Sequence, residues 1–236
     1  MKVLKETTYS SKNGKYKSEG TLKVKEKVRM QTSVGNDMGL ERDRIIGFVR
    51  NMKPKDHLIF LYSNLEDKHF VLFTYLKTGL ERGEATAYVA SQETPQQIRR
   101  AMKEYGIDIE RYELNGALRI IDYKDWYIIG GGFDPSVTLD HWKGLVEESK
   151  RRKFSGLRVL GEMSCFFDNE IVEDLMNYEN SFKKNAMPIM TICAYDKSLF
   201  TRQAAGYDPT EVLIGLLAAH STAIIMAPVE GVVKTI

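Results

Sequence analysis

The chain has 236 residues, of which 43% are hydrophobic and 28% charged, and its formal net charge at pH 7 is +2. This composition excludes a disordered or fibrous chain and is sufficient for one sizeable core with a small appendage. Two cysteines and no secretory-type pattern at the start predict a cytoplasmic protein without a disulfide framework.

Residues 1–36 are predicted to form a basic β-hairpin extension, and residues 37–236 a separate body. The extension carries nine Lys or Arg and three Glu, whereas the remainder is mildly acidic. Asn13-Gly14 favours a tight hairpin turn, because both central positions of a type I′ turn need positive φ. Between Leu22 and Met30 apolar residues alternate with Lys and Arg, which gives one apolar and one basic face. The basic face suits nucleic-acid phosphates, but a solvated edge that discourages sheet association is the favoured interpretation.

A helix is predicted from about Gly39 to Met52, and from His57 onward strand-like runs alternate with helical runs. The strand-like runs are LIFLYS, TAYVAS, LRIIDY, LRVLGEM, PIMTICAY and TAIIMA. Strands that alternate with helices of ten or more residues indicate βαβ units and a mainly parallel sheet. Because the strands are almost entirely apolar, both faces of the sheet should be covered by helices. The predicted fold class is therefore α/β, with three layers in the order α/β/α.

The segment from Val212 to Val229 contains no Asp, Glu, Lys or Arg and approaches the roughly 20 residues of a membrane span. The favoured alternative is a buried helix and a buried strand separated at His220-Ser221. Asp208 followed by Pro209 is a typical helix start, with an Asp N-cap and Pro at the first helical position. No membrane association is therefore expected.

The junction after LIFLYS is where nucleotide-binding proteins place a glycine-rich phosphate loop. Aligning Lys68 with the lysine of GxxxxGK[ST] puts Tyr62 and Asp67 at the glycines and His69 at the hydroxyl. Asp67 would repel phosphate, and no hydroxyl is available for Mg²⁺. Conventional ATP hydrolysis is therefore not expected, and the chain is predicted to be a non-catalytic protein without a cofactor.

In parallel α/β sheets ligands bind outside the carboxyl ends of the strands. Aromatic side chains there suit a small, largely apolar ligand with few polar anchors, although they are equally suited to core packing. Gly130 to Gly132 are expected to form a flexible loop over the sheet edge, with a lid over such a pocket as the functional alternative. The predicted ligand-binding residues at the strand ends are Tyr62, Ser63, Glu93, Tyr123, Trp126, Glu162, Cys165, Cys193 and Tyr195. His220, between a late helix and the last predicted strand, is included with them.

Several of these residues have simpler interpretations. Glu93 could complement the dipole of the following helix, and Cys193 could be a small buried hydrophobe. Cys165 follows a strand end, where its thiol could face the pocket. A buried histidine bonded to backbone groups is the default for His220, with a ligand or metal role as the alternative. Two cysteines and a histidine can bind a metal, but their sequence spacing does not favour it, so no metal site is predicted.

The stretch GLERGEATAYVASQETPQQIRRAMKEYGIDI resembles the corresponding part of KaiC/RecA-type ATPases. With the phosphate loop lost, the chain more closely resembles the MEDS domain, the sensory domain of DcmR-like regulators of methylotrophs and methanogens. The motifs that carry this resemblance run in order from His57 to His220: KDHLIFLY, GLERGE, GGGFD, LRVLGEMS, NYEN, ICAYD and AAHS. Glu162, in LRVLGEM, then stands where an ATPase has its Walker B carboxylate.

The resemblance implies a KaiC-like fold without the Walker A loop and a module that senses a small hydrocarbon derivative or related metabolite in signal transduction or transcription regulation. It makes His57 a ligand-site or structural residue; its place at the start of a strand favours the structural role. The chain departs from the family in having Cys165 where an aromatic is expected, and it shows no helix-turn-helix or kinase signature. Output through a homodimer or a signalling partner is expected. The alternatives are a degenerate nucleotide-binding protein or ATPase, and a nucleic-acid regulator that uses the basic hairpin.

Overall fold

The computed structural model describes residues 37–185, 187–201, 206–226 and 231–235. The predicted hairpin at Asn13-Gly14 and its basic face lie outside these residues. The described part is built around a seven-stranded sheet with the strand order β3-β2-β6-β7-β1-β8-β9. Adjacent strands from β3 to β8 are parallel, and β9 pairs with β8 in the antiparallel sense. The strands are β1 (His57–Tyr62), β2 (Ala85–Ala90), β3 (Leu118–Asp122), β6 (Leu157–Glu162), β7 (Met190–Asp196), β8 (Thr222–Met226) and β9 (Gly231–Thr235).

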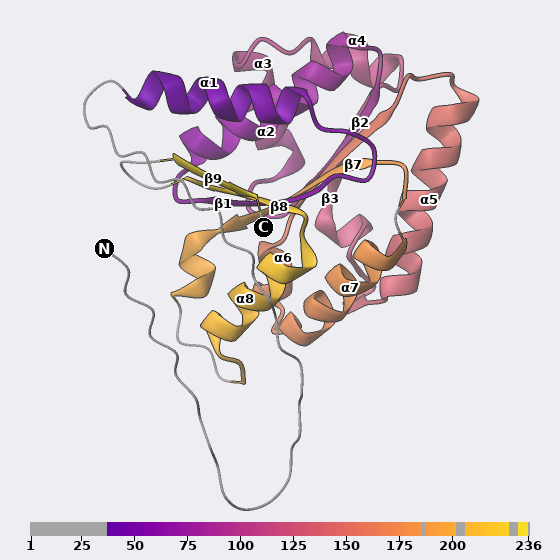
Figure 1. Cartoon of the computed structure of the whole chain (residues 1–236). Coiled ribbons are helices and arrows are strands. Elements are labelled where there is room, and N and C mark those ends of the chain that lie inside the picture. Colours follow the sequence, from indigo (N-terminus) through magenta and orange to yellow (C-terminus); the bar gives the residue numbers. More distant parts are fainter. Residues whose placement is uncertain (1–36, 186, 202–205, 227–230, 236) are drawn as a thin grey trace, which may run out of the picture. The chain divides into compact units, whose positions relative to one another are not determined.

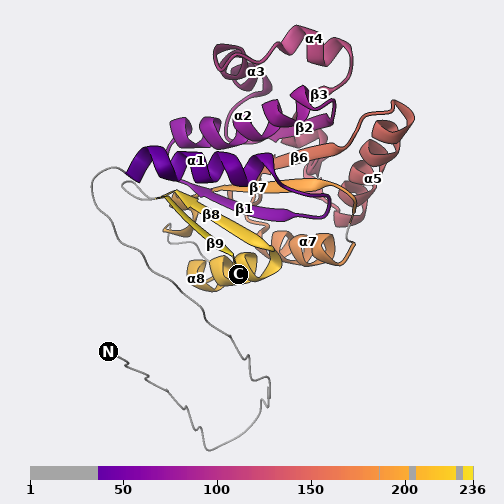
Figure 2. The same cartoon turned by 45° about the horizontal axis from the view of Figure 1, so that its top comes forward.

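Helices cover both faces of the sheet and give the predicted three-layer α/β/α fold (Figures 1 and 2). Alternate residues of each strand point to opposite faces, so that Leu58 and Phe60 of β1 join one core cluster while Ile59 and Leu61 join the other. The first face carries α1 (Asp37–Arg50), α2 (Leu65–Glu81), α3 (Pro95–Glu104) and α4 (Ile109–Leu114), and the second carries α5 (Pro135–Arg151), α6 (Ser164–Asp168), α7 (Val172–Asn185) and α8 (Pro209–Ala219).

The uncharged segment near the end of the chain is divided as predicted. The side chain of Asp208 caps α8 by accepting from the backbone N–H of Thr210, at 2.7 Å. His220 ends α8 in an extended conformation, and β8 begins at Thr222. Within the described residues no helix is both long and apolar enough to cross a membrane.

The glycine cluster forms a small hairpin rather than the flexible loop expected from the sequence. Strands β4 (Ile128–Ile129) and β5 (Gly132–Phe133) pair in the antiparallel sense. Gly130 and Gly131, with φ of 63° and 85°, make the two-residue turn between them. A two-residue turn with positive φ at both positions matches the strand twist, which is why two glycines suit it. The short 3₁₀ helices η1 (Tyr123–Asp125) and η2 (Lys197–Phe200) follow β3 and β7.

The GLERGE motif has a packing function. Arg158 in β6 is fully buried, and its guanidinium forms an ion pair with Glu84 and donates to the carbonyl of Val49 at 2.8 Å. Gly79 gives this side chain room, since a Cβ at Gly79 would lie 2.7 Å from the Cδ of Arg158. The motif therefore fixes α2 to the start of β2 and β6.

Candidate functional site

The turn between β1 and α2 occupies the place of a phosphate loop but is closed by its own side chains. The Oδ1 atom of Asn64 accepts from the backbone N–H of Asp67 at 2.8 Å, and the Asn64 amide donates to the Asp67 carboxylate at 2.8 Å. Glu66 and Asp67 place two carboxylates in the first turn of α2. A helix start that is capped and acidic does not attract phosphate.

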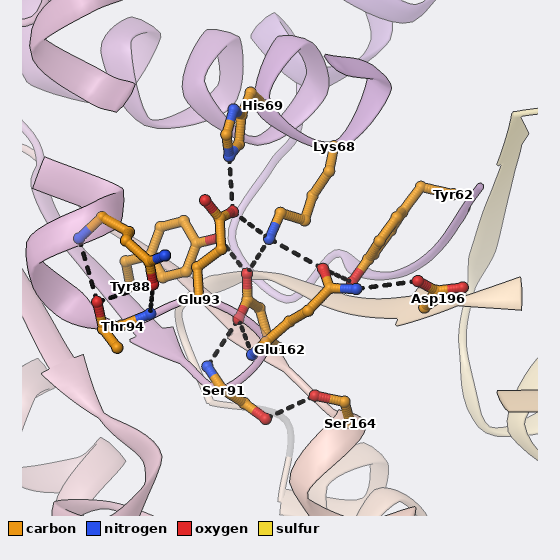
Figure 3. A network of polar contacts seen from close by, with 12 residues as sticks. Tyr62, Lys68, His69, Tyr88, Ser91, Glu93, Thr94, Glu162, Ser164 and Asp196 are labelled. Atoms are coloured by element: carbon orange, nitrogen blue, oxygen red, sulfur yellow. Dashed lines mark hydrogen bonds and ion pairs between the residues drawn. The ribbon is translucent and has the colours of Figure 1, made fainter. Parts of the chain in front are cut away.

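Lys68 is fully buried, and all of its hydrogen-bonding capacity is used within the protein (Figure 3). Its Nζ atom lies 2.5 Å from Glu93, 2.7 Å from Glu162 and 3.1 Å from the side-chain oxygen of Gln92. An ammonium group has three hydrogens to donate. Three acceptors, two of them carboxylates, therefore satisfy both its donors and its charge.

Glu162, at the end of β6, holds the loop that follows the neighbouring strand β2. Its carboxylate accepts from the backbone N–H groups of Ser91 and Gln92 and from the hydroxyl of Tyr88, each at 2.6 Å. The ion pair with Lys68 is a fourth contact. Because its lone pairs are engaged in this way, the residue in the Walker B place acts as an anchor for the β2–α3 loop.

Glu93 lies at the rim of this network, with its carboxylate 2.7 Å from the imidazole of His69. Burial opposes its ionisation, but hydrogen bonds and charge from His69 and Lys68 outweigh burial and hold the pKa of Glu93 at about 2. Glu93 was expected to complement the dipole of α3. The start of α3 is instead capped by Thr94, in a reciprocal arrangement with Gln97. Tyr62 completes the rim: its hydroxyl donates to Gln92 at 3.0 Å.

An aromatic cluster lies between the β4–β5 hairpin and the helices α6 and α7. The ring centroid of Phe133 is 4.8 Å from that of Phe166 and 5.6 Å from that of Tyr178, and Tyr127 lies 5.2 Å from Phe166. A surface hollow of about 290 Å³ opens beside this cluster. It is lined by Tyr127, Ile129, Gly132, Phe133, Asp134, Val137 and Thr138.

Of the predicted aromatic residues, Trp126 is adjacent to this hollow and Tyr123 is half-buried at the start of η1. The ring of Trp126 lies 4.6 Å from that of Trp142. Ser63 is exposed in the β1–α2 turn. Cys165 is buried at 1% exposure, and burial raises the pKa of its thiol to about 12. Such a thiol is unreactive at neutral pH.

The remaining predicted residues form a separate group on the α5–α8 side of the sheet. His57, Cys193, Tyr195 and His220 converge on one carboxylate, that of Glu179 in α7. Cys193 is in the middle of β7, not at its end, and pairs with Ile59 in β1. Burial lowers the pKa of His220 to about 4, so its imidazole is neutral at pH 7. Burial, with the Glu179 charge, raises the pKa of the Cys193 thiol well above its usual value.

Sequence reasoning did not select Tyr88 or Glu179 as site residues. A signal for Glu179 was present, because it lies four residues after Leu175 and three before Phe182, both of which are on the apolar stripe of α7. A carboxylate on a buried helix face needs polar partners. Tyr88 carried no such signal, since an aromatic residue in an apolar strand is normally interpreted as part of the hydrophobic core.

Comparison with known proteins assigns the chain to a family. The family model described as the methanogen/methylotroph, DcmR sensory domain (MEDS) matches residues 56–220, more than half of the chain. A UPF0273 protein of Pyrobaculum aerophilum is 42% identical over 48 residues, which are 20% of this chain and 17% of that protein. The chain thus matches less than a fifth of the length of this curated relative.

Two solved structures align with this chain. A KaiC-like protein of the hyperthermophilic archaeon Pyrococcus horikoshii OT3 aligns with a TM-score of 0.50 at 15% identity, over 78% of this chain and 80% of that one. The flagellar accessory protein FlaH of Methanocaldococcus jannaschii aligns with a TM-score of 0.49 at 16% identity, over 82% of each chain. The KaiC-like likeness supports the fold, and the extent of the family match shows that the chain belongs to the MEDS family of sensory domains.

Proposed function

We propose that this chain is a non-catalytic sensory protein that recognises a small, largely apolar organic molecule and not a nucleotide. In this proposal the bound ligand alters the contacts of the chain with a signalling partner or a second copy. Membership of a sensory-domain family supports a sensing role.

The observation that carries the proposal is the complete internal neutralisation of Lys68. In a phosphate loop the lysine must be free to reach the terminal phosphates. Here Glu93 and Glu162 lie within 2.7 Å of its ammonium group. A nucleotide would have to break a buried ion-pair network and then approach the carboxylates of Glu66 and Asp67. That cost disfavours phosphate binding at this edge of the sheet.

The hollow beside the β4–β5 hairpin is the place where we propose that the ligand binds. It lies beyond the end of β3, where ligands of parallel α/β sheets usually bind. Its wall is mainly apolar and aromatic, with Asp134 and Thr138 as polar groups. An apolar wall with a few polar anchors is typical of small-molecule sites.

Intrinsic fluorescence tests the proposal directly, because both tryptophans of the chain, Trp126 and Trp142, lie near the hollow. The protein should be titrated with a panel of small alcohols and of methylated and halogenated hydrocarbons. At least one compound should give a saturable change, together with a 1:1 mass increase in native mass spectrometry. Val137→Phe, which fills the hollow from a residue that is 39% exposed, should abolish the response.

Leu114→Phe is the matched control, because Leu114 is 89% exposed on α4 and does not line the hollow. It should respond like the unaltered chain. A compound whose response survives Val137→Phe would contradict binding in the hollow. Saturable stabilisation by Mg-ATP, with no response to any compound of the panel, would contradict the sensory proposal itself.

A further inference from the structure

The buried group on the α5–α8 side of the sheet combines four side chains that commonly bind metals. His57 starts β1, Glu179 comes from α7, Cys193 comes from the middle of β7 and His220 follows α8. Their exposures are 6%, 0%, 5% and 3%. One ligand atom from each lies within 4.8 Å of all the others.

Four of the six distances between these atoms are close to those of tetrahedral coordination. The Nε2 atom of His57 is 3.3 Å from the Cys193 Sγ atom and 3.3 Å from the Glu179 Oε2 atom. Oε2 is 3.6 Å from the Nε2 atom of His220 and 3.9 Å from Sγ. Ligand atoms around a tetrahedral zinc ion are separated by roughly 3.3–3.6 Å, given bond lengths of about 2.0–2.3 Å. The whole group spans up to 4.8 Å, so an ion would draw the most widely separated pair together by about 1 Å.

The orientation of His220 is suited to metal binding. Its Nδ1 atom lies 2.7 Å from the carbonyl oxygen of Leu216, so Nδ1 carries the proton and donates. Its Nε2 atom then presents a lone pair to the centre of the group, and this buried atom has no hydrogen-bond partner among the described residues. A metal-binding histidine commonly donates its other ring N–H to a carbonyl or carboxylate in this way.

Glu179 is also oriented as a metal ligand. The Tyr195 hydroxyl donates to its Oε1 atom at 2.8 Å, which leaves Oε2 facing the two histidines and the cysteine. The Nδ1 atom of His57 has no corresponding outer contact in the described part of the chain. Two of the four ligands, Glu179 and His220, are thus oriented by a second hydrogen bond.

Charge supplies an independent argument. In the described residues the ion-pair partners of the buried Glu179 carboxylate are the two imidazoles alone. A buried carboxylate without a permanent cation is costly. A divalent cation with one carboxylate, one thiolate and two neutral imidazoles has a net charge of zero. We propose that His57, Glu179, Cys193 and His220 form a closed four-ligand site for a divalent cation, preferably zinc.

The ligand set and the closure of the site define its role. Nitrogen, sulfur and oxygen ligands in tetrahedral arrangement select zinc over Mg²⁺ or Ca²⁺. Four protein ligands leave no open position for a substrate, which is the property of a structural site. The ion would join β1 and β7 to α7 and to the end of α8, and would tie together His57 and His220 at the two ends of residues 56–220. It would act whether or not the hollow binds a ligand.

Binding is balanced by the loss of one proton. The Cys193 thiol releases its proton to solvent and forms the sulfur–metal bond, whereas Glu179 binds as a carboxylate and the imidazoles bind through neutral nitrogens. No oxidant or reductant is involved. The apparent affinity for zinc should therefore rise with pH.

The full chain, freed of metal with a chelator, should be titrated with Co²⁺ as a spectroscopic substitute for zinc. We expect one ion per chain, the intense visible bands of tetrahedral cobalt and a thiolate-to-cobalt charge-transfer band. Cys193→Ser should lose the charge-transfer band, and its affinity should fall by more than the roughly 10- to 100-fold that loss of an outer contact costs. His220→Gln should weaken binding similarly.

Two matched controls separate the site from general effects. Cys165→Ser removes the other thiol, and His141→Gln removes a histidine on α5 that is outside the group. Both should bind cobalt with unchanged spectra. Absence of 1:1 binding, survival of the charge-transfer band in Cys193→Ser, or its loss in Cys165→Ser would each overturn the proposal.

The unaltered zinc-loaded chain gives a test that does not depend on a variant folding. X-ray absorption should show one sulfur at about 2.3 Å and three nitrogen or oxygen atoms at about 2.0–2.2 Å. Zinc should also raise the melting temperature of the chelated protein. A zinc environment without sulfur would contradict the assignment.

Discussion

Lys68 and Glu162 form a fully buried ion pair with 2.7 Å between Nζ and Oε1. Removal of one partner leaves an uncompensated buried charge, which costs about 3–5 kcal/mol of the free energy of unfolding. Lys68→Met should therefore destabilise the protein by that amount in urea denaturation.

The control is Lys103→Met. Lys103 and Glu110 are also separated by 2.7 Å, but their side chains are 67% and 70% exposed. An exposed pair contributes little to stability, because solvent screens its charges. If the two variants lost equal stability, burial would not be the determining factor at Lys68.

Mg-ATP should leave the melting temperature of the protein unchanged, because Lys68 and the start of α2 are satisfied by protein groups. A nucleotide present at 100 times its Kd would add about 2.7 kcal/mol to the free energy of unfolding and would clearly raise the melting temperature. Differential scanning fluorimetry with Mg²⁺ alone as the reference measures this. A shift that disappeared in Lys68→Ala would show that the site still binds nucleotide.

Glu93 should make the stability of the protein depend on pH in the acidic range. Its pKa is about 2 in the folded protein and 4.5 in its ordinary state, so the folded state holds its proton less tightly. The stabilisation is complete above about pH 4.5 and is lost as the pH falls toward 2. Glu93→Gln should be less stable than the unaltered chain at pH 6, and this difference should shrink in acid.

Urea denaturation at a series of pH values between 6 and about 2 measures this effect. Glu66→Gln is the control, because the Glu66 side chain is 80% exposed. It should have little effect at any pH. A constant difference between Glu93→Gln and the unaltered chain across this range would show that Glu93 does not contribute through its charge.

Two glycines in helices should respond oppositely to alanine. A Cβ at Gly79 would lie 2.7 Å from the Cδ of Arg158 and 2.9 Å from the Glu84 carboxylate, and Arg158 is fully buried. Gly79→Ala should therefore cost about 1–3 kcal/mol through overpacking. Gly144 in α5 is exposed, and a Cβ added there would have no neighbouring atom within 4 Å.

Gly144→Ala should stabilise the protein by about 0.5–1 kcal/mol, because alanine is the better helix former. Thermal and urea denaturation of both variants measure these changes in stability. Equal effects at the two positions would mean that the Arg158 contact does not limit Gly79.

Local sequence patterns determined most of the architecture. The alternation of apolar strands with amphipathic helices is a short-range property, and it predicted the parallel three-layer sheet and the α8–β8 division at His220. The missing glycines around Lys68 are the basis for predicting a loss of phosphate chemistry, because a backbone cradle needs residues without Cβ atoms. The Mg-ATP experiment tests this prediction.

The tertiary structure alone decided which side chains meet. Sheet order brings Glu162 beside the loop after β2, which makes a Walker B-like position an anchor for Lys68 and the backbone of Ser91. The packing of α7 and α8 on β1 and β7 brings Glu179 to His57 and His220. Such contacts join residues far apart in the chain, and no local pattern records them, because they depend on strand order and on which helix face is buried.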